Sequence, residues 1–261
     1  MSEEIMTITV VFTGPAGSGK TTLVFSYSKW VEENLNIRVA TVNLDPGAED
    51  IPYKPVFDIR NFFTLKDIMK KYGLGPNGAF IKASDLIAES INIIMNNEPF
   101  INIDKYDIVL IDTPGQMEIF MLRPASNVLF EKLKKISKPI IVFVLDGTAM
   151  ENVVDALTLW FINVLIHIKT GIYVIPVINK ADLMDRIEFA KILIENPESL
   201  LNISSDTLRG LINDIFKELV EISIKTKGPL RTVFVSATKG FNIDALHGII
   251  HEAFCACGDL T

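Results

Sequence analysis

Residues 8–22 read ITVVFTGPAGSGKTT, and their second half contains the pattern G-x-x-x-x-G-K-[ST] in full. An apolar, β-branched run precedes the pattern and a stretch with helical spacing follows it, so a strand, a loop and a helix are expected in that order. Glycines in such a loop let backbone N–H groups turn inward around an anion, and the start of the helix adds a favourable dipole. The stretch therefore predicts a phosphate-binding loop (P-loop), and a loop that merely turns the chain fits this arrangement less well.

Two residues of this loop have specific expected roles. The ammonium group of Lys20 is expected to bridge the β- and γ-phosphates of a nucleotide, and the hydroxyl of Thr21 is expected to bind Mg²⁺. The loop residues predicted to bind the nucleotide are Gly14, Pro15, Ala16, Gly17, Ser18, Gly19, Lys20, Thr21 and Thr22.

Short apolar runs alternate with longer stretches of helical spacing along the rest of the chain. Runs that predict strands lie at residues 8–13, 38–44, 106–111, 140–145, 173–178 and 232–235. Strands alternating with helices indicate βαβ units and a mainly parallel sheet covered by helices. We therefore predict an α/β fold, the three-layer sandwich of the P-loop NTPases, with the ligand site at the edge where the strands end.

Residues 46–98 depart from this alternation. They contain no convincing strand and are interrupted by prolines and glycines, so we predict a helical insertion with helices at 61–71 and 80–97. A second helical stretch is predicted at 185–227. Because no low-complexity linker divides the chain, a single domain of residues 1–261 is expected.

The composition favours a large buried core. Apolar residues make up 49% of the sequence and the mean hydropathy is +0.32, which buried parallel strands explain. The most apolar stretch, residues 157–178, is interrupted by polar residues and glycine, so no run of about eighteen apolar residues could span a membrane. The acidic N-terminus argues against a signal peptide.

Charge and cysteine content exclude further classes. The net charge is −7 and the isoelectric point about 5.1, so the chain has no basic footprint for nucleic acid or for an anionic membrane. Cys255 and Cys257 are too close in sequence to form a disulfide framework. A cytoplasmic protein without direct nucleic-acid binding is expected.

The third predicted strand is followed by Asp112-Thr-Pro-Gly115-Gln116, which fits D-x-x-G. A carboxylate at the end of that strand can hold a Mg²⁺-bound water, and the Gly115 amide can approach the γ-phosphate and sense its presence. The D-x-x-G pattern alone is weak evidence for a nucleotide site. At a strand end about ninety residues after the P-loop, it is strong evidence.

The fifth predicted strand ends in Asn179-Lys180-Ala181-Asp182. The Asp182 carboxylate can accept two hydrogen bonds from guanine, and adenine lacks those donors. After the last predicted strand, Ser236, Ala237 and Thr238 suit a backbone contact to the guanine oxygen. If N-K-x-D stood alone, a polar turn would explain it. Because the P-loop, D-x-x-G, N-K-x-D and Ser236–Thr238 occur in this order at strand ends, we predict that the ligand is GTP, bound with Mg²⁺.

The remaining motifs narrow the class. Gly75-Pro76-Asn77 lies inside the insertion, and Asn43-Leu-Asp45-Pro46 precedes it, followed by Pro52 and Tyr53. With DTPGQ, these residues resemble the GPN-loop GTPases of archaea and eukaryotes. The resemblance extends from about residue 8 to the final helix.

The resemblance implies a homodimer whose subunits face each other across their nucleotides. In such dimers the Gly-Pro-Asn loop reaches the partner's site near the γ-phosphate, which makes Asn77 a candidate catalytic residue. The alternative is a surface turn that only caps the helix beginning near Phe80. By motif match, Asp45, Gln116 and Glu118 are expected around the attacking water, and Asp45 joins Thr21 and Asp112 as a candidate metal ligand.

The chain departs from the family and its branch in two places. Gly47 stands where the family commonly has alanine, which is expected to loosen that loop. Some relatives in the wider NTPase branch carry a lysine early in the P-loop that crosses the dimer. Here Pro15, Ala16 and Gly17 occupy that region, so another group must neutralise the charge.

Three function classes stay open. The first is a GTP-hydrolysing switch, and the second is an assembly factor or nucleotide-sensing scaffold with negligible turnover. Eukaryotic relatives are associated with RNA polymerase assembly, so by analogy the unidentified protein client is expected to be polymerase-related. The third is a GTP-dependent metallochaperone, for which His247, His251 and Cys255 on a final helix at 242–254 are the candidate ligands.

Two further groups have open alternatives. Arg60 and Arg123 could act on the γ-phosphate, although a structural ion pair is favoured for each. An apolar group after DTPGQ could line a dimer or client surface, or form a buried helix face. Its members are Met117, Phe120, Met121 and Leu122.

Overall fold

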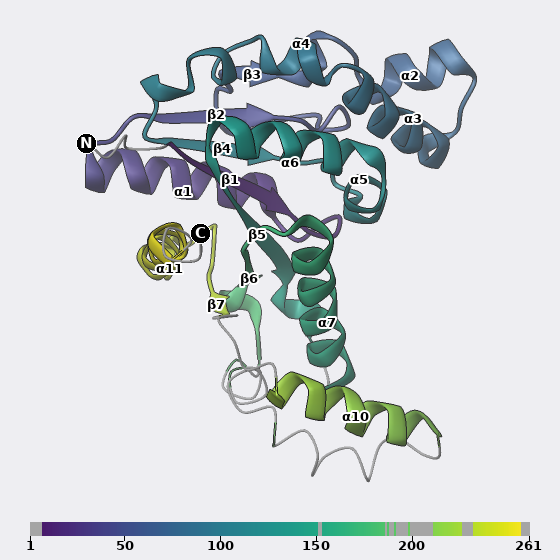
Figure 1. The fold of residues 1–261 in the computed structure, drawn as a ribbon, viewed down its shortest axis with the longest axis vertical. Helices are drawn as coiled ribbons and strands as arrows, with labels where there is room; N and C mark the ends of the chain where they lie inside the picture. Colours follow the sequence, from purple (N-terminus) through teal and green to yellow (C-terminus); the bar gives the residue numbers. More distant parts are fainter. Residues whose placement is uncertain are drawn as a thin grey trace.

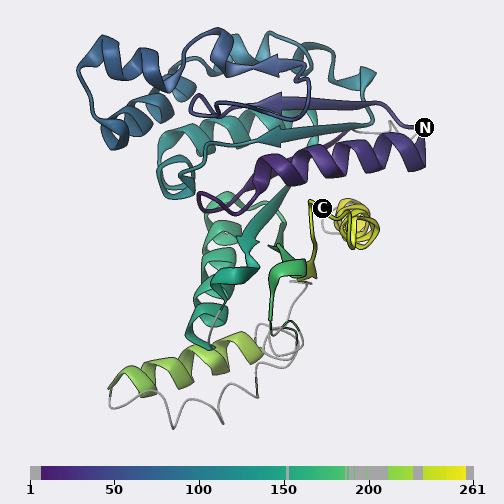
Figure 2. The ribbon, with the colours of Figure 1, turned by 180° about the vertical axis from the view of Figure 1, so that it is seen from behind.

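The computed structural model describes residues 7–150, 153–185, 187, 191, 198, 211–225 and 232–256. Their strands form one parallel sheet in the order β3-β2-β4-β1-β5-β6-β7 (Figures 1 and 2). The strands are β1 (Ile8–Thr13), β2 (Val39–Asn43), β3 (Phe57–Asp58), β4 (Ile108–Asp112), β5 (Lys138–Asp146), β6 (Val174–Asn179) and β7 (Val233–Phe234). The predicted α/β fold with a parallel sheet is confirmed.

Strand β3 lies in the stretch for which the sequence predicts no strand, and that prediction is wrong. Phe57 and Asp58 pair with Val42 and Asn43 of β2, at the edge of the sheet. Two residues are too few to show the period of two that reveals a strand. The segment is extended because Phe57 is buried in the core, which holds its backbone against β2.

Helices occupy most of the remaining described chain. They are α1 (Lys20–Leu35), α2 (Leu65–Tyr72), α3 (Pro76–Glu89), α4 (Ile91–Met95), α5 (Met117–Leu122), α6 (Pro124–Ile136), α7 (Val153–Thr170), α10 (Leu211–Lys225) and α11 (Ile243–Ala256). Short 3₁₀ turns are η1 (Ile59–Asn61), η2 (Phe100–Lys105), η3 (Gly147–Ala149) and η4 (Ala181–Leu183).

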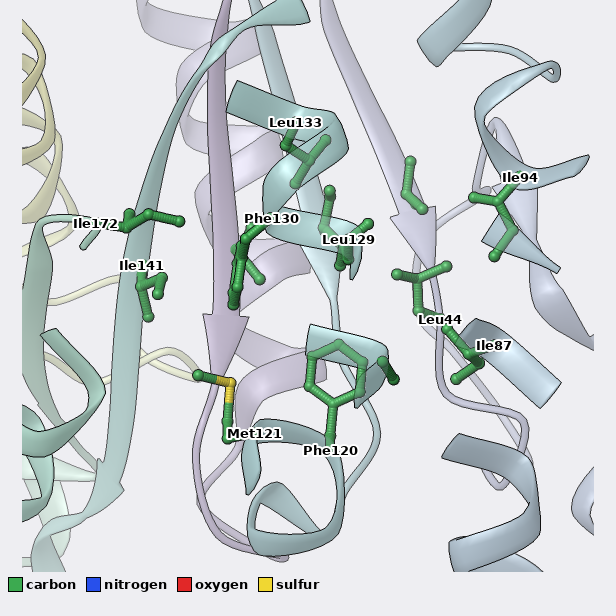
Figure 3. Close-up of a cluster of buried hydrophobic side chains, with 14 of the residues drawn as sticks. Leu44, Ile87, Ile94, Phe120, Met121, Leu129, Phe130, Leu133, Ile141 and Ile172 are labelled. Carbon is green, nitrogen blue, oxygen red and sulfur yellow. The ribbon is translucent and has the colours of Figure 1, made fainter. Parts of the chain in front are cut away.

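The sheet lies between two layers of helices because successive strand residues point to opposite faces. Val10 and Phe12 of β1 pack with α1 and α11, whereas Val11 packs in the cluster that includes α3 to α6. Figure 1 shows α6 in front of the sheet, and Figure 2, seen from behind, shows α1 there. Figure 3 shows the cluster on the side of the sheet that Val11 faces, with Phe120 of α5 and Leu129 of α6 among its buried side chains.

The insertion is helical only in its second part, and its helices begin at other residues than predicted. α2 begins after Thr64, whose hydroxyl and amide exchange hydrogen bonds with Asp67 in a capping box. α3 begins at Pro76, whose fixed φ suits the first helical turn. The stretch predicted as one helix at 80–97 contains the end of α3 and the separate α4. The α2–α3 pair extends beyond the end of the sheet (Figure 1).

The C-terminal predictions are confirmed where the structure describes them. Of the helical stretch predicted at 185–227, α10 is described, and most of the rest lies outside the described residues. The final predicted helix at 242–254 is present as α11. None of the helices in the described segments has the length and apolarity needed to cross a bilayer.

Candidate nucleotide-binding site

The P-loop joins β1 to α1 and requires glycine at particular positions. Gly14, Gly17 and Gly19 all have positive φ, at 151°, 78° and 86°, a region that side-chain-bearing residues rarely adopt. A Cβ on Gly14 would overlap the carbonyl oxygen of Val144, and one on Gly19 would overlap the side-chain amide of Asn179. All three backbone conformations therefore favour glycine, and at Gly14 and Gly19 a side chain would also meet neighbouring atoms.

Lys20, the first residue of α1, points back into this loop. Its ammonium group donates to the carbonyl oxygens of Gly14 (2.9 Å) and Pro15 (3.0 Å), and the residue is buried. Burial lowers the pKa of Lys20, and the nearby carboxylates of Asp112, Asp45 and Glu118 oppose this. Lys20 is thus held inside the loop by two backbone carbonyls and lies within the electrostatic influence of three predicted acidic site residues.

Asp112 ends β4 and is completely buried. Burial raises its pKa to about 6, while the hydroxyls of Thr21 and Tyr53 favour the ionised form and lower it. Oδ2 accepts a hydrogen bond from Tyr53 (3.0 Å), and Oδ1 has no partner among the described residues. A carboxylate oxygen left free beside a threonine hydroxyl fits Mg²⁺, which prefers hard oxygen ligands.

Asp45 connects two motifs that are seventy residues apart. Its Oδ1 accepts from the amide of Gly47 (2.8 Å), and its Oδ2 accepts from the amide of Gly115 (3.0 Å). Burial raises the pKa of Asp45, and these two hydrogen bonds oppose the rise. The Gly115 amide, predicted to approach the γ-phosphate, therefore contacts the carboxylate of Asp45 in this structure.

The remaining predicted catalytic residues of this region lie at the start of α5. Gln116 is the residue before the helix and is half-buried, and Glu118 is exposed in its first turn. The negative charge of Glu118 contributes to raising the pKa of Lys20, against the effect of burial.

Gly47 packs more tightly than the resemblance implies. A Cβ on Gly47 would lie 3.2 Å from Oδ1 of Asp45 and 3.2 Å from a ring carbon of Phe80 in α3. An alanine at this position would require Asp45 or Phe80 to shift by a few tenths of an ångström, and the expected loosening of the loop stays a prediction.

Gly75-Pro76-Asn77 forms the beginning of α3, although the sequence predicts a helix only from residue 80. Gly75 precedes the helix, Pro76 is its first residue, and all three residues are exposed. Among the described residues, a Cβ on Gly75 would meet no atom within 4 Å. Contacts within the described chain therefore do not explain this glycine, and the tripeptide faces outward.

The predicted base-binding motifs meet the P-loop at Asn179. This buried side chain donates to the carbonyl of Ser18 (2.9 Å) and accepts from the amide of Ala237 (3.0 Å). Ser236 and Ala237 are buried, whereas Thr238 and the carboxylate-bearing Asp182 are exposed. One asparagine therefore fixes three segments relative to each other, and Asp182 remains accessible to a base.

Sequence reasoning missed several polar residues beside the site. Asp146 ends β5, pairs in register with Asn179 and forms an ion pair with Lys180. Its place after an apolar strand was the available signal. Tyr53, known from the sequence only as a mark of the resemblance, bonds to Asp112. Asp58 is not among the predicted site residues because β3, the strand that it ends, was not predicted.

The structure also resolves the open alternatives for two groups. Arg60 pairs with Asp58 and Arg123 pairs with Asp85, in agreement with the favoured structural role. Met117, Phe120 and Met121 form a buried helix face, as one alternative held, while Leu122 is 71% exposed.

The candidate metal ligands of α11 do not form a cluster. His247 contacts the hydroxyl of Tyr27 (2.9 Å), and His251 lies 3.8 Å from the sulfur of Cys255. In the part of the chain that the structure describes, no group of three or more His, Cys, Asp or Glu residues could hold a metal ion. Cys257 lies outside that part.

A parallel sheet with a P-loop, a buried aspartate at the neighbouring strand end and an accessible N-K-x-D aspartate defines a P-loop NTPase of the guanine-nucleotide type. Residues 12–256 match a family model described as "Conserved hypothetical ATP binding protein". Over 257 residues the chain is 34% identical to a GPN-loop GTPase of Pyrococcus abyssi, covering 97% of this chain and 99% of the relative. The chain belongs to the GPN-loop GTPases, and it is a GTPase.

Two further comparisons agree. A crystal structure of an apo-form GTPase from Pyrococcus abyssi superimposes with a TM-score of 0.83 at 30% identity, covering 97% of this chain and 99% of that one. GPN-loop GTPase 1 of Dictyostelium discoideum is 28% identical over 91% of this chain, which spans 59% of that relative's length. The relatives' names agree with the guanine selectivity expected from Asp182, whereas the family model's description mentions ATP.

Proposed function

We propose that this GTPase is a Mg²⁺-dependent switch that works as a homodimer and assists the assembly of a protein complex. The observation that supports a switch is the contact between the Asp45 carboxylate and the Gly115 amide. It links the loop after β2 to the loop after β4, beside the P-loop. A γ-phosphate that competes for this amide would therefore act on both loops at once.

The chain's own residues suit hydrolysis by positioning and charge stabilisation. Lys20 holds a positive charge inside the loop, where it would stabilise charge on the β- and γ-phosphates. Asp45 and Gln116, with Glu118, would orient the attacking water, and Asn77 of a second subunit would contact the phosphates. Thr21, Asp112 and Asp45 are the residues that would hold Mg²⁺, which when bound neutralises charge on the phosphate oxygens.

The client proposed is a protein rather than a nucleic acid, because the net charge of −7 gives no electrostatic footprint for a polyanion. RNA polymerase is the candidate that the family resemblance suggests. The exposed Leu122 at the end of α5 is an apolar side chain that such a client could contact.

The test compares GTP, GDP and a non-hydrolysable GTP analogue. Sedimentation is expected to show a dimer with the analogue. GTP hydrolysis in single-turnover assays is expected to require Mg²⁺, and pull-downs are expected to recover a client in one nucleotide state only.

In Gln116→Ala, we expect a lower kcat with nearly unchanged GTP affinity, because a group that orients water acts mainly in the transition state. Normal kcat in this variant would show that another residue positions the water.

A further inference from the structure

The loop that carries Asp45 is tied to the edge strand by one arginine. Arg60 donates from its backbone amide and from Nε and Nη2 to the Asp58 carboxylate, at 2.6–3.1 Å. Its Nη1 donates to the carbonyl oxygens of Ala48 (3.1 Å) and Glu49 (3.0 Å). The guanidinium thus connects β3 to the far side of the turn that begins at Asp45.

A second connection runs to Asp45 itself through a buried amide. Nδ2 of Asn43 donates to Asp58 (2.9 Å) and to the carbonyl of Asp45 (3.3 Å), and Oδ1 accepts from the Asp45 backbone amide (3.0 Å). Asn43 has no exposed surface. In the sheet it lies in register between Asp58 of β3 and Asp112 of β4. Asp58 therefore orients Asn43, and Asn43 orients the backbone of Asp45.

The Arg60–Asp58 pair has the geometry of a rigid contact rather than of a loose surface pair. The side chains are only 23% and 13% exposed. Burial by itself would raise the pKa of Asp58, but hydrogen bonds from Arg60 and Asn43 outweigh it, and the pKa lies below its ordinary value. Two parallel N–H···O contacts to a carboxylate also fix orientation, which a point charge cannot do.

We propose that Arg60 and Asp58 are positioning residues for Asp45, acting through Asn43 and through the Ala48 and Glu49 carbonyls. The inference rests on the proposed role of Asp45 in hydrolysis and adds residues outside the known motifs to it. Nε, Nη1 and Nη2 of Arg60 all donate to Asp58 or to the loop carbonyls. The arginine would therefore lose some of these hydrogen bonds if it contacted a γ-phosphate.

The chain contains a matched control. Arg38 contacts Asp107 in the same way, from its backbone amide (2.8 Å), Nε (3.2 Å) and Nη2 (3.0 Å). This pair lies next to the other end of β2, away from the strand ends that carry the site. Arg38→Gln therefore measures the loss of an Arg–Asp pair with the same donor atoms, in a more exposed position and away from the site.

The experiment compares Arg60→Gln, Asp58→Asn, Asp45→Asn and Arg38→Gln by single-turnover GTP hydrolysis, affinity for a fluorescent GTP analogue, and amide hydrogen exchange over residues 44–50. We expect Arg60→Gln and Asp58→Asn to reduce kcat at least about tenfold, the usual scale for losing an outer partner of a site residue. Their nucleotide affinity should change little, and the Gly47 amide, which bonds to Asp45, should exchange faster. Arg38→Gln should match the wild type in all three measurements.

The outcomes distinguish the positioning role of Arg60 and Asp58 from the role of Asp45 in hydrolysis. Wild-type turnover in Arg60→Gln and Asp58→Asn, with turnover lost in Asp45→Asn, overturns the positioning role. Equal losses of kcat and affinity also overturn it, since they indicate general disorder of the site. If Asp45→Asn remains active, the proposed role of Asp45 in hydrolysis fails. Hydrogen exchange at residues 44–50 then tests whether Arg60 positions the loop. Unchanged exchange in Arg60→Gln overturns this positioning, and faster exchange supports it.

Discussion

Two aspartates of the site differ in burial, and the difference suits their predicted partners. Asp182 is exposed, so its carboxylate can meet a base that enters from solvent. Asp112 is fully buried at the end of β4, and burial makes its ionised form costly. Tyr53 offsets part of this cost by donating a hydrogen bond to Oδ2.

Guanine selectivity should depend on Asp182. In Asp182→Asn, GTP binding is expected to weaken by about 2–3 kcal/mol, the scale of a hydrogen bond lost to a charged group. Binding of xanthosine triphosphate should improve, because its extra oxygen accepts from the new amide. Titrations of both nucleotides check this, and unchanged GTP affinity would exclude Asp182 as the base-recognising residue.

Tyr53 should matter for Mg²⁺ rather than for nucleotide selectivity. Tyr53→Phe removes the donor to Asp112 and leaves the ring, so the Mg²⁺ concentration for half-maximal turnover is expected to rise by up to about tenfold. Tyr72→Phe, at an exposed position of α2, is the control. An unchanged Mg²⁺ requirement in Tyr53→Phe would mean that the hydroxyl does not help to orient Asp112.

At the scale of elements, α5 is a short helix with two different sides. Phe120 and Met121 enter the core (Figure 3), and Met117 belongs to the same buried cluster. Leu122, by contrast, is largely exposed. The helix directly follows Gly115 and Gln116, so its packing helps to set the position of these two residues. A buried face on so short a helix anchors the turn that precedes it.

Phe120→Ala should therefore destabilise the protein strongly. Removal of a fully buried phenylalanine ring is expected to lower the free energy of unfolding by about 3–5 kcal/mol. Leu122→Ala should change it by less than about 0.5 kcal/mol, because that side chain is largely exposed. Denaturant titrations of both variants measure the difference. Similar losses in the two would contradict the burial of this helix face.

At the scale of the whole molecule, the parallel sheet brings segments from distant parts of the sequence to one edge. Asn179 contacts Ser18 and Ala237, and Asp45 contacts Gly115. The α2–α3 pair extends away from this edge and carries Asn77 on its surface (Figure 1). Among the described residues a Cβ on Gly75 would meet no atom within 4 Å, and the role proposed for the tripeptide is toward a second subunit.

Mixing two inactive variants tests that role. Asn77→Ala subunits lack the loop amide, and Lys20→Ala subunits lack the P-loop ammonium. If the loop acts across the dimer, each heterodimer contains one site with both groups intact, and mixing should restore part of the GTP hydrolysis. Subunit exchange is verified with differently tagged chains. Exchange without recovered activity would show that the loop does not work in trans.

The site motifs could be predicted from sequence because each depends on local chemistry. The glycines of the P-loop, the aspartate of DTPGQ and the N-K-x-D motif follow apolar runs, and parallel strands bring their carboxyl ends to one edge. The same reasoning predicts the central strands, whose apolar residues alternate or run continuously. The mode of assembly and the catalytic roles stay predictions.

The edge strand β3 and the polar contacts beside the site were decided only by tertiary structure. β3 has two residues and exists because Phe57 is buried against other elements, so no local pattern reveals it. The contacts of Arg60 with Ala48 and of Tyr53 with Asp112 likewise depend on residues that only folding brings together. By itself, the sequence determined which residues can bind phosphate and guanine, because that chemistry is carried by short segments. Which side chains hold those residues in place was decided by folding, because hydrogen-bond partners are chosen by proximity in space.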